Sequence, residues 1–400
     1  MPNIKLTRYE TQWIAKDARY VYTDDNNKVH QAALTYGVVY RRILDRVESD
    51  MMHTLVEHEG VRYEILSKAL GCLSSVVHRM DWLAWLVVNN DGNAFDYERR
   101  EDGKLIRVEE HALGRYYGML SILVRAIFDG ELDLDRFKLP PHAELFRDVV
   151  RYHVDRIPIL ADCFDRLPTY FDRNVCRFCG ELANDLFNLL RHEGKARKIS
   201  KILASWKGDS VRTFERMQEF KRECFAKHPE LFVMQLECGY APPDGKSPVP
   251  INRAKGDHAT FVNRLRHNAR FAAVAIGGIW SLAWGELKGH RFRWIFFLNA
   301  ELVQDSTEWV ELVAGAWHAA VPEDAAYVRI PGLNDSPSPV AGLVRVDDTV
   351  RMRLLDEELD YNAQKDNFIR FREAEGARSW GTWVPANTRE DRRRRLIPEE

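Results

Sequence analysis

The chain has 400 residues, of which 45% are hydrophobic and 30% are charged, and its net charge is −2. This length allows two or three domains with sizeable cores. The near-neutral charge excludes a protein that binds polyanions over its whole surface, so any nucleic-acid surface must be local. The sequence has no apolar run long enough to cross a bilayer, and its first residues are polar. We therefore expect a cytoplasmic protein without a membrane partner.

Residues 1–220 are predicted to form an all-α N-terminal region. Apolar residues recur there at spacings of three and four, as on one face of an amphipathic helix, and several of these stretches stop at a glycine. Pro158 should end or kink one of them. The expected helices lie within Val29–Gly60, Glu64–Val88, Glu109–Gly130, Ala143–Leu167, Arg173–Arg191 and Lys198–Ala226.

Six cysteines are scattered along the chain, which favours reduced thiols over a disulfide framework. Cys176 and Cys179 form one CxxC pair. A structural zinc site needs a second pair of ligands, and only His192 stands at a suitable offset. The surrounding sequence has helical periodicity, so the alternative is that both thiols face a seam between packed helices. We favour this alternative and expect neither a metal nor a cofactor.

The composition changes after the helical region, and residues 225–385 are predicted to form an α+β domain built on an antiparallel sheet. Residues 241–257 and 331–340 are rich in proline, glycine and polar residues and are expected to be loops. Apolar runs at Ala272–Trp284 and Arg293–Leu298 are typical of strands.

A basic and polar tail, residues 386–400, ends the sequence. Arg389 and the run Arg392–Arg395 would give this tail non-specific affinity for DNA. The alternative is a solvated end, because acidic residues on both sides dilute the positive charge.

The run from Gly289 to Leu298 is the most informative part of the sequence. It reads as a strand whose last five residues, Trp294–Leu298, are apolar, as in a strand covered on both faces. Side chains alternate along a strand, so Arg291 and Arg293 should share one face. Two guanidiniums in a central strand are costly without an anionic partner, and phosphate is the obvious candidate. The alternative is that both arginines are solvated at an open sheet edge.

Seven segments in this half of the chain form a recognisable series: His228–Tyr240, Phe261–Phe271, Ile279–Gly289, Gly289–Leu298, Glu308–Trp317, Leu354–Phe371 and Ala377–Trp383. In order and spacing they resemble the core of the inovirus-type (YagK/YfjJ family) replication initiators, which belong to the HUH rolling-circle endonucleases. The resemblance implies the HUH fold for residues 225–385. It also implies an activity in which two histidines and an acidic residue hold a metal at the scissile phosphate, and a tyrosine attacks that phosphate.

The sequence departs from this family at the metal site. Arg291 and Arg293 stand where the family has its two histidines, and Ala283 stands near the position of the acidic ligand. Gln364 replaces a lysine three residues after the tyrosine, whereas the tyrosine is kept as Tyr361. Arginine stays protonated and cannot ligate a metal. We therefore expect metal-dependent nicking to be lost.

Three functions remain open after these observations. The first is a non-cleaving protein that binds single-stranded or hairpin DNA, with Arg291 and Arg293 gripping a phosphate. Such a protein would act in replication or its control in a phage, plasmid or integrated element. The second is a metal-independent nickase in which Tyr361 attacks the scissile phosphate. The positive charge and the acid catalysis would then come from Arg291, Arg293, His290 and Lys365. A regular strand would, however, point His290 away from both arginines.

The third function is that of a protein-interaction or regulatory module formed by the helical region, with the second half serving as scaffold. The two kinds of function predict different surfaces. DNA binding or nicking needs a basic groove, whereas an interaction module needs an exposed apolar patch on the helical half.

Overall fold

The computed structural model describes residues in thirteen stretches of the chain. These are 21–23, 29–31, 46–47, 53–58, 61–66, 73–128, 132–157, 160–240, 249–285, 289–321, 326–330, 340–372 and 376–386. The chain divides into two compact units. The first contains residues 1–48, 69–134 and 139–200, and the second contains residues 49–68, 135–138 and 201–400.

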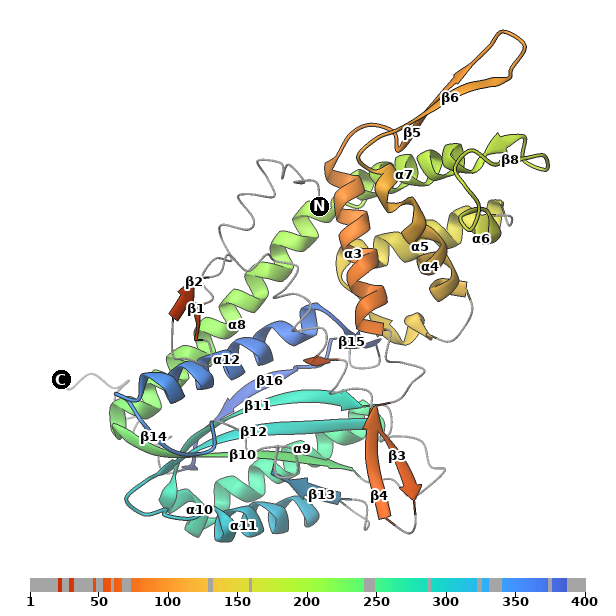
Figure 1. The fold of residues 1–400 in the computed structure, drawn as a ribbon. Helices are drawn as coiled ribbons and strands as arrows, with labels where there is room; N and C mark the ends of the chain where they lie inside the picture. Colours follow the sequence, from red (N-terminus) through yellow and green to blue (C-terminus); the bar gives the residue numbers. More distant parts are fainter. Residues whose placement is uncertain are drawn as a thin grey trace, which may run out of the picture. The chain divides into compact units, whose positions relative to one another are not determined.

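The first unit is built mainly from helices (Figure 1). They are η1 (Gly114–Tyr116), α3 (Leu73–Asn89), α4 (Tyr117–Phe128), α5 (Pro141–Arg156), α6 (Leu160–Cys163) and α7 (Cys179–Ala196). α3 packs against α5 and α7, because each helix places buried apolar residues such as Met80, Leu145 and Leu186 on one face. Gly194 allows close packing of α7, since a Cβ atom there would lie 2.9 Å from Cγ2 of Val88.

Two β-hairpins also belong to the first unit, so the prediction of an all-α region is wrong. The hairpins pair β5 (Phe95–Arg99) with β6 (Leu105–Glu110), and β8 (Phe171–Asp172) with β9 (Arg177–Phe178). The turn between β5 and β6 contains Gly103, whose φ of +80° suits glycine. The helix expected at Glu109–Gly130 therefore starts only at Tyr117, after β6 and η1.

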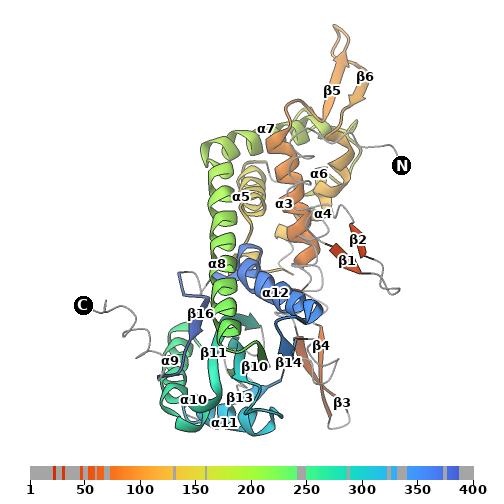
Figure 2. The ribbon, with the colours of Figure 1, turned by 90° about the vertical axis from the view of Figure 1, so that its left-hand side faces the viewer.

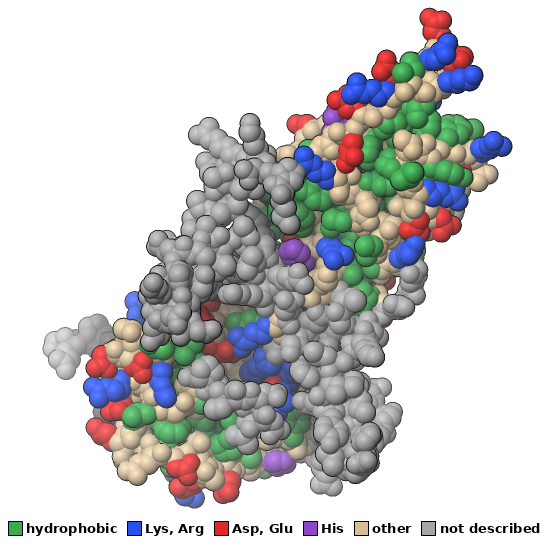
Figure 3. Space-filling view, viewed as in Figure 1, with side chains coloured by type: hydrophobic (Ala, Val, Ile, Leu, Met, Phe, Trp, Pro, Cys, Tyr) green, Lys and Arg blue, Asp and Glu red, His purple; other side chains and the backbone are tan. Residues whose placement is uncertain are grey.

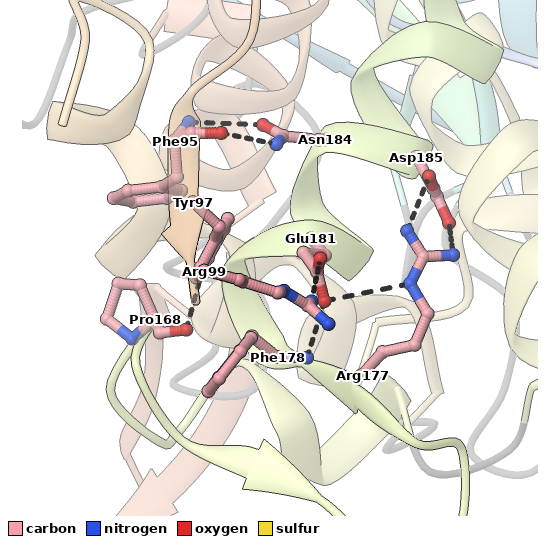
Figure 4. A network of polar contacts seen from close by, with 9 residues as sticks. All are labelled: Phe95, Tyr97, Arg99, Pro168, Arg177, Phe178, Glu181, Asn184 and Asp185. Atoms are coloured by element: carbon pink, nitrogen blue, oxygen red, sulfur yellow. Dashed lines mark hydrogen bonds and ion pairs between the residues drawn. The ribbon is translucent and has the colours of Figure 1, made fainter. Parts of the chain in front are cut away.

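The β5–β6 hairpin is anchored on α7 by side chains that replace strand partners (Figure 4). The amide of Asn184 accepts a hydrogen bond from the backbone N–H of Phe95 (3.2 Å) and donates one to its carbonyl (2.7 Å). The Tyr97 hydroxyl donates to the carbonyl of Pro168 (2.9 Å). The Asn184 amide thus satisfies two backbone groups of β5, and Tyr97 ties the hairpin to the segment between α6 and β8.

A further correction concerns the beginning of the chain. The described residues there form β1 (Val21–Thr23), β2 (Val29–Gln31), β3 (His53–His58) and β4 (Val61–Leu66), with β1 paired to β2 and β3 to β4. The helix expected at Val29–Gly60 is therefore wrong at residues 29–31 and 53–58, whereas residues 46–47 are helical. In β4, Val61, Tyr63 and Ile65 alternate with polar Arg62 and Glu64, which is the period of a strand.

The second unit contains an antiparallel sheet with the order β13–β10–β12–β11–β16, and β14 also pairs with β10. Its strands are β10 (Glu230–Tyr240), β11 (Ala275–Gly285), β12 (Gly289–Asn299), β13 (Ala326–Arg329), β14 (Gly342–Arg345) and β16 (Trp380–Trp383). All of these pairs are antiparallel. The prediction of a mixed α and β protein with an antiparallel sheet is confirmed.

Helices cover both faces of this sheet (Figures 1 and 2). On one face lie α9 (Ile251–His267), α10 (Ala269–Val274) and α11 (Thr307–His318), and on the other α8 (Ile199–Lys227) and α12 (Thr349–Gln364). Along β12, Trp294 and Phe296 enter the core under α9, α10 and α11, whereas Ile295 and Phe297 enter the core under α8 and α12. This double burial explains the continuous apolar run of β12.

The expected elements of the second half largely recur, with shifted ends. Of the segments that resemble the initiator core, Glu308–Trp317 lies within α11, and Leu354–Phe371 covers the second part of α12 and η3 (Lys365–Asn367). The loop expected at 241–257 is shorter than expected, because α9 starts at Ile251. Residues 331–339, in the second expected loop, and the tail beyond residue 386 lie outside the described residues.

A short two-stranded ribbon completes the second unit. β7 (Phe137–Lys138), which follows η2 (Leu134–Arg136), pairs with β15 (Arg370–Phe371). The ring of Phe371 stacks on Trp284 of β11 at 4.0 Å, so the ribbon packs on the end of the sheet. None of the described helices is both long enough and apolar enough to span a membrane.

Candidate functional site

A row of charged residues crosses the sheet of the second unit. Glu237 of β10 lies opposite Arg293 of β12 on one side and opposite Arg329 of β13 on the other. Arg291, two residues before Arg293, points to the same face because side chains alternate along a strand. This is the face covered by α8 and α12, since Ile295 of the same alternation lies in that core.

The carboxylate of Glu237 is the centre of this row. Its Oε1 atom accepts hydrogen bonds from Nε of Arg329 (2.8 Å) and from the hydroxyl of Tyr327 (2.9 Å). Its Oε2 atom accepts one from Nε of Arg293 (3.2 Å) and forms an ion pair with Nε of Arg291 (3.1 Å). Glu237 and Arg291 are almost fully buried. The anionic partner of the two predicted arginines is thus a protein carboxylate.

This arrangement corrects one alternative reading of the sequence. β12 is a central strand with β10 and β11 on its two sides, so Arg291 and Arg293 do not lie at an open sheet edge. Their burial is tolerated because Glu237 offsets the cost of desolvating the guanidiniums.

The electrostatics keep Glu237 ionised. Burial by itself would raise the pKa of this carboxyl, but the positive charges of Arg291, Arg293 and Arg329 outweigh burial and lower the pKa to about 2. Burial, together with the negative charge of Glu237, raises the pKa of Tyr327. At neutral pH the tyrosine is therefore a neutral donor and the glutamate a charged acceptor.

Gly239 leaves the space through which the side chain of Tyr327 reaches the carboxylate of Glu237. A Cβ atom at Gly239 would lie 2.6 Å from both Cζ and the hydroxyl oxygen of Tyr327. The two residues face each other in the β10–β13 register, and the tyrosine ring lies across the glycine to reach Glu237. Only glycine leaves room for this crossing.

The end of α12 meets the sheet at neighbouring positions. Ser281 of β11, which faces Arg293 in the register, donates a hydrogen bond to Oδ1 of Asn362 (2.8 Å). Nζ of Lys365 donates to the carbonyl of Leu282. Tyr361 lies in the same last turn of α12 and is buried. The structure thus brings this turn to the face of the sheet that carries the arginines.

His290, the remaining predicted site residue, lies on the other face, as the alternation of β12 predicts. It is opposite Trp284 in the register, and its ring lies 6.2 Å from that of Phe371. Burial and the nearby charge of Lys255 lower its pKa to about 4. His290 is therefore neutral at pH 7 and cannot serve as the acid beside the arginines that a metal-free nickase would need.

A second group of cations lies on the β7–β15 ribbon. Lys138 is directly opposite Arg370. Arg136, just before β7, lies over the rings of Trp284 (5.3 Å) and Phe371 (5.6 Å). Like charges directly opposite each other disfavour a strand pair, and the position of Lys138 over the ring of Trp206 (5.5 Å) offsets part of that cost. Figure 3 shows lysine and arginine side chains gathered over the second unit near the middle of the view.

Glu237, Arg329 and Tyr327 were not predicted from the sequence. A signal for the first existed, because Glu237 is the one acidic residue inside the apolar run from Leu231 to Tyr240, and a charge in a buried strand requires a partner. No pattern in the sequence around Arg329 indicated its role, because Arg329 reaches Glu237 only through the pairing of β13 with β10.

The CxxC pair does not form a ligand cluster. Cys179 is buried at the start of α7, whereas Cys176 is exposed and its thiol donates to the carbonyl of Arg173 (3.4 Å). The sulfur next to Cys179 is that of Cys163, at 3.0 Å. Among the residues that the structure describes, no group of three histidine, cysteine or acidic side chains is placed to hold a metal ion.

Comparison of the chain with models of protein families, with curated proteins and with solved structures finds no match. The function is therefore inferred from the arrangement around Glu237 and from the chemistry of its residues.

Proposed function

We propose that the second unit binds single-stranded or hairpin DNA through its phosphates, without metal-dependent nicking, and acts in replication or its control. One observation carries this proposal: three guanidiniums from β12 and β13, the two strands that flank β10, converge on a single ionised carboxylate. The resemblance of residues 225–385 to rolling-circle initiators supports DNA as the source of the phosphate.

The geometry divides the arginines into two roles. The side chains of Arg293 and Arg329 are 16% and 39% exposed, whereas that of Arg291 is 4% exposed. The two more exposed residues are the ones that a ligand can reach, and Arg291 with Glu237 would hold them in place. Both contact Glu237 through Nε. The planar fork of a guanidinium matches the geometry of phosphate oxygens.

Arginine is well suited to such a site for a second reason. It stays protonated at every relevant pH and is more weakly hydrated than lysine. Phosphate contacts fix the position of a nucleic acid without reading its sequence. We therefore expect binding with weak sequence preference and strong dependence on salt.

Replacing Arg293 and Arg329 by alanine should weaken binding of single-stranded DNA, because two phosphate contacts are lost. The slope of log K against log salt concentration should become shallower by about 0.7 for each lost contact. Fluorescence anisotropy with a labelled oligonucleotide at several salt concentrations measures both quantities.

Arg345→Ala is the matched control for this experiment. Arg345 lies on β14 of the same sheet but is exposed and paired with Asp347, so its loss should leave the salt slope nearly unchanged. Equal slopes for the double variant and the unmodified protein would refute phosphate binding by Arg293 and Arg329.

A second candidate function, protein interaction by the first unit, is favoured by its exposed apolar side chains. Leu167 is 73% exposed, and Tyr170 and Phe171 are 44% and 41% exposed. Side chains of this kind, close together in the chain, are typical of contact surfaces. If the unmodified protein binds neither single-stranded nor hairpin DNA in the anisotropy experiment, this function takes precedence.

A further inference from the structure

Two buried thiols of the first unit lie within reach of a covalent bond. The sulfur atoms of Cys163, the last residue of α6, and Cys179, the first residue of α7, are 3.0 Å apart. Neither residue is exposed to solvent. A disulfide bond is about 2.05 Å long, so closing it requires a movement of about 1 Å, which small rotations of the two side chains can supply.

We propose that Cys163 and Cys179 are a site of reversible disulfide formation that fastens the segment 164–178 to the start of α7. This proposal concerns the first unit and is independent of DNA binding by the second. The bond would join Cys179 to Cys163 rather than to Cys176, the other cysteine of the CxxC pair.

The backbone around the two cysteines is already fixed by hydrogen bonds. The N–H of Cys179 donates to the carbonyl of Tyr170 (2.9 Å), and that of Gly180 donates to the carbonyl of Pro168 (3.1 Å). The same carbonyl of Pro168 accepts from the Tyr97 hydroxyl (Figure 4). The Tyr117 hydroxyl donates to the carbonyl of Cys163 (3.3 Å). These bonds hold both Cα atoms, so that oxidation leaves the fold of the unit intact.

The surroundings also assign an order to the reaction. Burial and the hydrogen bond to Cys179 raise the pKa of Cys163 to about 12, so Cys163 remains a protonated thiol at neutral pH. Because Cys163 keeps its proton, we assign the first attack to Cys179 and the second to Cys163.

The oxidant we propose is a small peroxide, because both sulfurs are buried and a bulky disulfide would not reach them. As the sulfur of Cys179 attacks one peroxide oxygen, the O–O bond breaks and the thiol proton passes to the departing oxygen. Cys179 becomes a sulfenic acid and one water leaves. The sulfur of Cys163 then attacks the sulfenic sulfur and displaces hydroxide, which takes the Cys163 proton and leaves as a second water. The two thiols lose two electrons, and one hydrogen peroxide is reduced to two waters.

The disulfide would restrict a segment that carries an exposed apolar surface. Residues 164–178 include Leu167, Tyr170 and Phe171, all largely exposed. A cross-link between the ends of this segment removes conformations from its locally unfolded states. We therefore expect slower amide hydrogen exchange in residues 164–178 after oxidation, and no change in the second unit.

The experiment treats the full chain with a low excess of hydrogen peroxide, blocks remaining thiols with iodoacetamide and maps the peptides by mass spectrometry. The expected result is one cross-linked peptide pair joining Cys163 to Cys179, which dithiothreitol separates again. Cys176→Ser should retain the cross-link and Cys163→Ser should lose it. Cys238→Ser, a buried cysteine of the second unit, is the matched control and should also retain it.

Three results would overturn the proposal. They are a Cys176–Cys179 cross-link in the unmodified protein, over-oxidation of Cys179 without any cross-link, and full alkylation of Cys163 and Cys179 after peroxide treatment. Each comes from the unmodified chain, so the test does not depend on whether a cysteine variant folds.

Discussion

Glu237→Ala is expected to destabilise the second unit by about 3–5 kcal/mol, the usual cost of removing one partner from a buried ion pair. The reason lies in Arg291, whose side chain is 4% exposed and which loses its contact with a fully buried carboxylate. Arg293 and Arg329 lose the same carboxylate. Urea unfolding followed by tryptophan fluorescence measures the change, because Trp294 and Trp317 lie in the core of this unit.

Two further variants separate charge from shape in this cluster. Glu237→Gln keeps the volume and one acceptor, so its cost should be smaller than that of Glu237→Ala. Combining Glu237→Met with Arg291→Leu removes both charges and should recover part of the loss, because apolar replacement of a buried ion pair is often tolerated.

The matched control is Glu357→Ala, which breaks an exposed pair with Arg353 and should cost less than about 1 kcal/mol. A cost equally small for Glu237→Ala would show that the cluster is not a buried ion network.

Acidification is expected to destabilise the second unit well before its carboxylates titrate. Burial lowers the pKa of His258 to about 3, and burial with the charge of Lys255 lowers that of His290 to about 4. Both imidazoles are thus held neutral in the folded unit, but they take up protons near pH 6.5 when it unfolds. Their contribution to stability is complete above pH 6.5 and is lost as the pH falls towards 4 and then 3.

The expected slope follows from proton linkage. Each histidine should remove about 1.4 kcal/mol of unfolding free energy per pH unit below 6.5, and the two together should remove twice that. Glu237 adds to the loss only below pH 4.5, because its pKa is about 2 in the folded unit. Urea unfolding between pH 7.5 and 4.5 therefore isolates the histidines.

A substitution at His258 tests which residue is responsible. Its ring stacks on Phe292 at 3.9 Å and contacts Trp280 at 4.6 Å, so His258→Phe fits the aromatic core and should halve the slope. His267→Gln changes an exposed histidine of the same helix, α9, and should leave the slope unchanged. An unaltered slope in His258→Phe would mean that this residue is not kept neutral by burial.

The sequence predicted the elements with strong, continuous patterns. The apolar runs of β11 and β12 identify these strands without the structure, because burial on one or two faces leaves a local trace. The shared face of Arg291 and Arg293 also followed from the period of a strand, and so did the opposite direction of His290.

What the sequence did not reveal depends on pairings between distant segments. Glu237 meets Arg329 only because β13 pairs with β10 in one register, and Cys163 meets Cys179 only because α6 ends beside the start of α7. The hairpin β5–β6 was missed for a different reason. Its strands are short and mostly polar, and its anchor, Asn184, lies some ninety residues away on α7.

One measurement tests the central claim most directly. The unmodified protein and Tyr361→Phe are each incubated with labelled single-stranded and hairpin DNA. The incubations are done in Mn²⁺, in Mg²⁺ and in EDTA. Each sample is then run on a native gel and on a denaturing gel. Binding by a metal-free arginine cluster predicts a shifted band on the native gel in all three buffers and no covalent adduct on the denaturing gel. An adduct that forms only with metal and disappears in Tyr361→Phe would contradict the claim, and an adduct that survives EDTA would identify a metal-free nickase instead.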